Sequence, residues 1–152
     1  MYKRQPIKKS HTSTSSSLGK NDYEHLSDFR HRLRQFLRAS ELACRAHGLT
    51  ALQYQLLLHV AGFPGRSWAT IGELAERLQA HHHGVVALVD RCAALPLLER
   101  RPGRQDGRVV EIHPSPKRET LLAQVAAPHR ADLHRPLCEV PQQAATRGAE
   151  IS

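Results

Sequence analysis

The feature that most constrains the fold is a change in the spacing of apolar residues near residue 96. From residue 26 to residue 95, apolar side chains recur every three or four positions, as they do on one face of a helix. Two short apolar-rich runs, 97–101 and 109–112, then flank the turn-forming segment 102–107, which predicts a β-hairpin. Helical spacing returns after Ser115 and Pro116, an N-cap followed by a first-turn proline. The sequence therefore predicts several helices, one hairpin and a further helix.

Four helices are expected before the hairpin. Gly48 is placed to end the first of them. Thr50 with Gln53, and Thr70 with Glu73, are capping-box patterns that open the second and third helices. The fourth covers residues 81–95, and its predicted buried face consists of Val85, Leu88, Val89 and Cys92. After the hairpin, Pro128 is expected to kink the last helix and Pro136 to stop it.

This order of elements is typical of a winged helix-turn-helix. The short helix 71–78 would brace the helix 81–95, whose exposed N-terminal residues can enter the major groove of DNA. We therefore predict a mainly α fold with a small β-wing, in which the winged helix-turn-helix is flanked by dimerisation helices. Residues 1–22 are expected to be a disordered basic leader, and residues 23–135 the domain, with a DNA-binding core at about 50–115. Residues 136–152 are expected to be a weakly structured tail.

The charge of the chain favours a polyanionic partner. Lys and Arg number 22 against 14 Asp and Glu, which gives a net charge of +8 and a pI near 10. Nucleic acid is the first candidate partner and an anionic membrane surface the second. No apolar run is long enough to span a bilayer, so we expect a cytoplasmic protein. The three cysteines are far apart and form no CxxC pair, which argues against a disulfide framework and a cysteine zinc site.

Candidate DNA contacts come from the fourth helix and the hairpin. Base readout is assigned to the start of the helix, a backbone clamp to its far end, and phosphate or minor-groove contact to the hairpin. The residues are His81, His82, His83, Val86, Ala87, Arg91, Arg101, Arg104, Asp106 and Arg108. Asp106 is expected to hold Arg108 in place by a charge-assisted hydrogen bond. A solvated basic loop is the alternative for the hairpin arginines.

The three consecutive histidines His81, His82 and His83 have two other interpretations. One is a polar helix start that faces solvent. The other is a metal site, which is disfavoured because consecutive helical residues point about 100° apart and cannot converge on one ion.

These stretches together resemble the MarR (multiple antibiotic resistance regulator) family. TIGELAERL (residues 70–78) is similar to that family's first motif helix, and VVALVDR (85–91) to its recognition-helix core. RRPGRQDGR (100–108) is similar to the wing signature, and SPKRETLL (115–122) to the start of the next helix. The chain departs from the pattern at Pro96, where the family commonly has Gly, at Pro114, which replaces a frequent Leu, and at Pro128.

The resemblance implies a homodimer that binds pseudo-palindromic double-stranded DNA and often responds to a small amphipathic or phenolic effector. Mixed apolar and polar side chains are the expected lining of such an effector pocket. We assign it to Phe36, Leu37, Arg38, Tyr54 and His59.

No catalytic centre is predicted. Glu111 with His113, and Asp28 with His31, lack a third partner, and such pairs are more often surface ion pairs. No metal or cofactor is expected. Cys44 is either a buried, inert thiol or an oxidant sensor. The sequence thus predicts a ligand-responsive transcriptional repressor that is not an enzyme, and a winged-helix protein–protein interaction module without DNA binding is the alternative.

Overall fold

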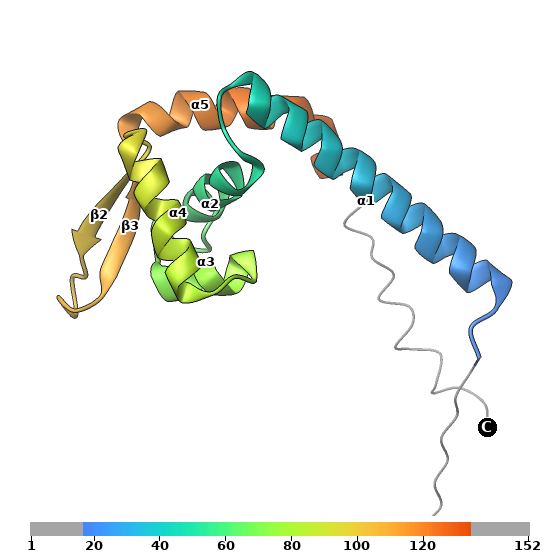
Figure 1. Cartoon of the computed structure of the whole chain (residues 1–152), viewed down its shortest axis with the longest axis horizontal. Helices are drawn as coiled ribbons and strands as arrows, with labels where there is room; N and C mark the ends of the chain where they lie inside the picture. Colours follow the sequence, from blue (N-terminus) through green and yellow to red (C-terminus); the bar gives the residue numbers. More distant parts are fainter. Residues whose placement is uncertain (1–16, 135–152) are drawn as a thin grey trace, which may run out of the picture.

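The computed structural model describes residues 17–134 (Figure 1). The elements are α1 (Lys20–Ala46), α2 (Ala51–Ala61), β1 (Ala69–Thr70), α3 (Ile71–Leu78), α4 (His82–Ala94), β2 (Leu98–Pro102), β3 (Val110–Pro114), α5 (Pro116–Ala126) and the 3₁₀ helix η1 (Ala127–His134). The mainly α fold with a small β-wing is confirmed. Helix α1 begins inside the segment assigned to the leader; residues 1–16, the tail 136–152, Pro136 and Cys138 lie outside the described residues. No helix within 17–134 is long and apolar enough to cross a membrane.

Helix α2 is the centre of the core. Leu56, Leu57 and Val60 are completely buried, and α2 contacts α1, α3, α4, α5 and β3. Its start is fixed by the predicted capping box. The Thr50 N–H donates to Gln53 Oε1 at 2.9 Å, and the Gln53 N–H donates to Thr50 Oγ1 at 3.1 Å.

Helix α1 extends well beyond the rest of the domain (Figure 1). At about 1.5 Å per residue, its 27 residues make a rod roughly 40 Å long. Only its C-terminal part reaches the core, where Cys44 is fully buried. Leu26 and Leu37 remain about half exposed farther along the rod. The helix ends at Ala46, two residues before Gly48, whose positive φ of 72° suits a residue without a side chain and terminates the helix as predicted.

Helices α3 and α4 form the helix-turn-helix. The Thr70 N–H donates to Glu73 Oε2 at 2.8 Å, and the Glu73 N–H donates to Thr70 Oγ1 at 3.3 Å, so the second predicted capping box is also present. The predicted inward face of α4 is confirmed, because its four apolar residues are all buried: Val85, Leu88, Val89 and Cys92.

The wing, residues 98–114, is the outer part of a three-stranded antiparallel sheet in the order β1-β3-β2. Arg101 pairs with Glu111 across β2 and β3, and Thr70 pairs with Glu111 across β1 and β3. The two-residue strand β1 was not predicted, since it is too short to show a period. At the start of the turn, a Cβ on Gly103 would lie 2.5 Å from the Asp106 carbonyl oxygen, so this turn requires glycine.

The connection into α5 corrects one prediction. Ser115 stands at the N-cap position, yet its hydroxyl does not cap the helix; it donates to the carbonyl oxygen of Pro96. Pro96 has a φ of 22°, far from the value near −65° that its ring favours. The α-helical hydrogen bonding stops at Ala126, and a 3₁₀ helix follows that contains Pro128, where the sequence predicted a kink.

Arg118 on α5 is an unexpected core residue. Its side chain is buried, and its Nε and Nη1 atoms have no hydrogen-bond partner in the structure. Burial lowers the pKa of its guanidinium. The sequence does not predict this burial. The spacing of apolar residues in α5 identifies only apolar core positions such as Val125, which is fully buried.

Candidate nucleic-acid interface

The N-terminal end of α4 presents an exposed polar surface. His81 is the N-cap residue. The first three residues of the helix, His82, His83 and Gly84, are all exposed. The His81 and His83 rings are stacked, with centroids 5.7 Å apart. No cluster of metal-ligating side chains was found among residues 17–134. A helix N-terminus carries unpaired N–H groups and a partial positive charge, so this end of α4 favours an anionic partner such as a phosphate.

A groove brings this helix end next to the wing. The groove has a volume of about 450 Å³ and lies between α3, α4 and the wing strands. His82 and Val86 line it from α4, and Arg100 and Arg108 line it from the wing. Three of the predicted contact residues, His82, Val86 and Arg108, therefore share one surface.

Two ion pairs organise the arginines of β2. Arg100 pairs with Asp90, which ties the wing to the outer face of α4. Arg101 Nη2 lies 2.9 Å from Glu99 Oε2 within the same strand. Arg91 is exposed one residue after Asp90. The wing and the recognition helix are thus joined by a salt bridge that sequence analysis did not identify, although its partners lie in the motifs VVALVDR and RRPGRQDGR.

Asp106 acts on the backbone of the wing turn, which corrects the predicted contact with the Arg108 side chain. Its Oδ1 accepts the Arg108 backbone N–H at 3.0 Å. This is the usual way in which an aspartate stabilises its own turn. The ion pairs found in residues 17–134 include neither Arg104 nor Arg108, and both side chains are exposed. Both guanidinium groups are therefore accessible to an external anion.

The base of the wing contains a buried histidine–carboxylate hydrogen bond, where the sequence suggested a surface pair. Glu111 and His113 are only 4% and 7% exposed. The His113 Nε2 atom lies 2.7 Å from Glu111 Oε2, and Glu111 Oε1 accepts the Arg104 backbone N–H at 3.3 Å. The side-chain hydrogen bond from His113 holds the pKa of Glu111 below its ordinary value of 4.5.

An arginine–aromatic cluster lies beside this pair and was also missed by sequence analysis. The indole of Trp68 is stacked on the His113 ring, with centroids 5.8 Å apart and planes 21° apart. The Arg66 guanidinium lies 3.8 Å from the Trp68 ring centroid and 4.3 Å from that of Phe63. Arg66 also pairs with Glu73 at the start of α3.

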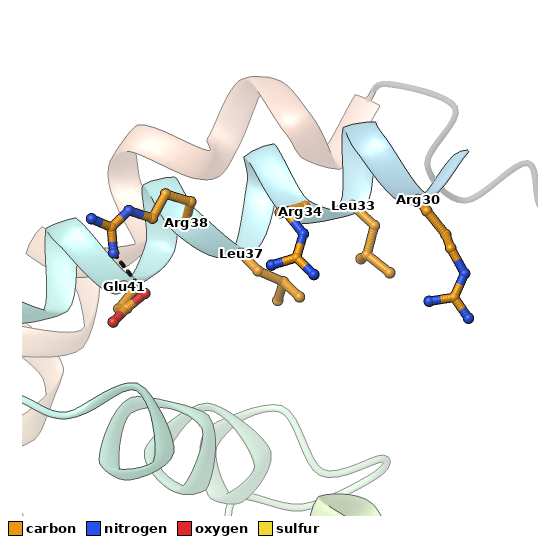
Figure 2. Close-up of a pocket in the computed structure, with 6 residues that line it drawn as sticks. All are labelled: Arg30, Leu33, Arg34, Leu37, Arg38 and Glu41. Carbon is orange, nitrogen blue, oxygen red and sulfur yellow. Dashed lines mark hydrogen bonds and ion pairs between the residues drawn. The ribbon is translucent and has the colours of Figure 1, made fainter. Parts of the chain in front are cut away.

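The five residues of the predicted effector pocket do not line one described cavity. Tyr54 is buried in the core, His59 is half-buried on α2, and the Phe36 ring faces His129 of η1 at 5.3 Å. Leu37 and Arg38 instead line a cavity of about 610 Å³ along α1 (Figure 2). Its other described lining residues are Arg30, Leu33, Arg34 and Glu41.

Both described cysteines are buried. Burial raises the pKa of the Cys44 thiol, and it raises the pKa of the Cys92 thiol to about 11. The inert-thiol interpretation of Cys44 therefore fits its surroundings better than an oxidant sensor, which requires an accessible thiolate.

The Glu111–His113 pair predicts a pH dependence of stability. Because the folded state lowers the pKa of Glu111, its stabilising contribution is fully present above the ordinary value of 4.5 and is lost as the pH falls through the folded-state pKa. The free energy of unfolding of wild type and Glu111→Gln, measured by denaturant titration between about pH 3 and pH 7, should therefore converge at the acid end. Glu99→Gln, which changes an exposed carboxylate in β2, is the control. Parallel curves for wild type and Glu111→Gln would contradict the assignment.

Known proteins resemble this chain both in sequence and in fold. The model of the MarR family matches residues 47–109. No curated protein sequence matches the chain. Among solved structures, a MarR family transcription regulator is 24% identical, with a TM-score of 0.62 over 73% of this chain and 72% of its own.

Two further solved structures match the fold over a larger share of this chain. A cysteine-to-serine mutant of MarR from E. coli, solved in complex with operator DNA, is 22% identical, with a TM-score of 0.59 over 80% of this chain and 85% of its own. The transcriptional regulator BldR from Sulfolobus solfataricus is 20% identical, with a TM-score of 0.59 over 82% of this chain and 89% of its own. The predicted resemblance to the MarR family is therefore confirmed, in sequence across residues 47–109 and in fold across the part of the chain that the structure describes.

Proposed function

We propose that this chain is a transcriptional regulator that binds double-stranded DNA in a sequence-specific manner as a homodimer, and that it is not an enzyme. The observation that carries the proposal is the groove between α3, α4 and the wing, where His82, Val86 and Arg108 face the same side. A recognition helix that enters the major groove beside a basic wing needs this arrangement. The E. coli MarR structure with operator DNA, which has the same fold, also supports it.

The contacts are assigned to two classes. Arg104 and Arg108, with Arg91 and Arg101, would neutralise phosphates and position the protein on the duplex. His82 and His83, with the half-buried Val86 and Ala87, would meet base edges in the major groove. Specificity is therefore assigned to α4, and most of the salt-dependent affinity to the wing.

The assignment predicts different effects for the two classes. If a dimer neutralises roughly 6–10 phosphates, log K should fall with log salt at a slope of about −0.9 per phosphate. Arg108→Ala should weaken binding to all duplexes and reduce the slope by about 0.9 for each phosphate that is no longer neutralised. His83→Ala should weaken binding to preferred duplexes, selected from a random pool, more than to random ones. Fluorescence anisotropy across a salt series measures both.

Arg32→Ala is the matched control for charge. Arg32 is exposed on α1 and pairs with Asp28, so its removal changes the net charge without touching the groove. It should leave affinity and slope near wild type. If the wild type binds no duplex at low salt, the DNA-binding proposal is wrong, and the protein–protein interaction module becomes the better interpretation.

The homodimer is proposed from the exposed apolar side chains of α1. Tyr23 and Leu26 are 57% and 51% exposed along a helix that projects from the domain (Figure 1). Such a helix gains stability when its apolar residues pack against a second helix. A second copy of α1 is the proposed partner, and it would set the spacing of the two winged helices to about one turn of DNA.

Leu26→Glu should therefore convert the dimer into a folded monomer. Leu26 is 51% exposed, so the substitution leaves the core of each protomer intact. Leu58→Glu, at a 41% exposed position on α2, is the control and should remain dimeric. Sedimentation at roughly tens of micromolar protein decides between the two states. A wild-type monomer at that concentration would contradict the proposal.

An anionic, amphipathic effector is proposed for the cavity along α1. Leu33 and Leu37 give this cavity apolar surface, and Arg30, Arg34 and Arg38 give it positive charge (Figure 2). Such a lining suits a molecule with an aromatic ring and a carboxylate. An effector that binds one dimer geometry better than another would change DNA affinity by that difference.

Salicylate is the proposed probe. It should raise the melting temperature of the wild type and release bound DNA, because its carboxylate meets the arginines of the cavity. Arg34→Ala combined with Arg38→Ala should abolish both effects, whereas Arg32→Ala should abolish neither, since Arg32 does not line the cavity. Thermal shift and displacement of labelled duplex measure the two effects. Salicylate responses that survive in the double variant would refute this site.

A further inference from the structure

We propose that Arg66, Trp68, Glu111 and His113, named here the wing bridge, are positioning residues that hold the wing in its DNA-binding orientation. This inference rests on the proposed function and deepens it, because it assigns part of the affinity to residues that do not face the DNA groove. None of the four lines the groove between α4 and the wing.

The first half of the bridge reaches the wing turn. Glu111 lies in the central strand β3, and its carboxylate accepts the backbone N–H of Arg104, at the start of the turn that carries the candidate DNA contacts. The same carboxylate is held by His113 at 2.7 Å. Because both side chains are more than nine-tenths buried, loss of either partner leaves an uncompensated polar group in the interior.

The second half reaches the helix-turn-helix. The His113 ring is stacked on Trp68, directly before β1, and the Arg66 guanidinium lies over the Trp68 ring. Arg66 then pairs with Glu73, the residue whose carboxylate caps α3 through the Thr70 N–H. An unbroken series of contacts therefore joins the wing turn to the first turn of α3.

Packing alone does not fix the wing in this region. A cavity of about 380 Å³ separates the wing turn from the segment between α2 and β1, and Trp68, Arg104 and Asp106 are among the residues that line it. The outer surface of the wing is exposed. Among the described residues, the wing is joined to α4 by the Asp90–Arg100 salt bridge and to the segment before α3 by the β1–β3 pairing, and the bridge adds the Trp68–His113 stack beside that pairing.

Disruption of the bridge should reduce the population of the binding-competent wing and leave the bound complex unchanged. Apparent affinity falls in proportion to the competent fraction, so a fraction of about one tenth weakens binding about tenfold. The bound state keeps all its phosphate contacts, so the slope of log K against log salt stays at the wild-type value. Removal of a direct contact, as in Arg108→Ala, instead lowers that slope.

Three substitutions separate the parts of the bridge. Glu111→Gln removes the carboxylate that contacts His113, His113→Phe keeps an aromatic ring on Trp68 but removes the hydrogen bond, and Trp68→Leu removes the stack. Trp68→Phe is the conservative variant and should restore most of the affinity that Trp68→Leu removes. Each variant is titrated with duplex DNA at a temperature at which its thermal unfolding curve shows that it is fully folded. A decrease in global stability alone then does not change the measured affinity.

Amide hydrogen exchange in the free protein tests the bridge without DNA. The Arg104 amide should be protected in the wild type and should exchange faster in all three disruptive variants, whereas the amides of α2 should keep their protection. Wild-type affinity in the folded variants, or a lowered salt slope, would overturn the positioning role. If the wild type itself binds no duplex, the proposed function fails, and unchanged Arg104 exchange in the variants would then overturn the bridge as well.

Discussion

The mutual packing around α2 is the constraint on which the remaining structure depends. This helix contributes Leu56, Leu57 and Val60 to the core with no exposed surface, and α1, α3, α4, α5 and β3 all contact it. In a closely packed interior, no element can move without displacing its neighbours, so the position of α2 constrains the positions of the elements around it. The orientation of α4 and the place where β3 leaves the body are therefore both set by the same helix. The groove between α4 and the wing is a product of that shared support.

The elements predictable from sequence are those that short-range physics determines. Thr50 with Gln53, and Thr70 with Glu73, place helix starts because a side chain and a backbone N–H only three residues away satisfy each other. The outward face of α4 follows from the inward one, since Val85, Leu88 and Val89 leave His82 and His83 on the other side. These local rules were sufficient to predict the winged helix and to place His82 and His83 on the exposed side of α4.

The interactions missed from sequence are those between residues whose proximity only the tertiary fold creates. Trp68 and His113 are far apart in the chain and meet because β1 pairs with β3. Asp90 and Arg100 meet because the chain reverses between α4 and β2. Asp106 was assigned to the Arg108 side chain, but the turn places its carboxylate closer to the backbone N–H. Burial of Glu111 and Arg118 likewise has no signature in the spacing of apolar residues.

The position of Trp68 has a spectroscopic consequence. It is the single tryptophan of the sequence, and it lies where β1 meets the base of the wing, between an imidazole and a guanidinium. Emission from an indole depends on the charge and polarity of its immediate neighbours. The tryptophan fluorescence of this protein therefore originates at one defined place, the base of the wing, and reports on its surroundings without any added label.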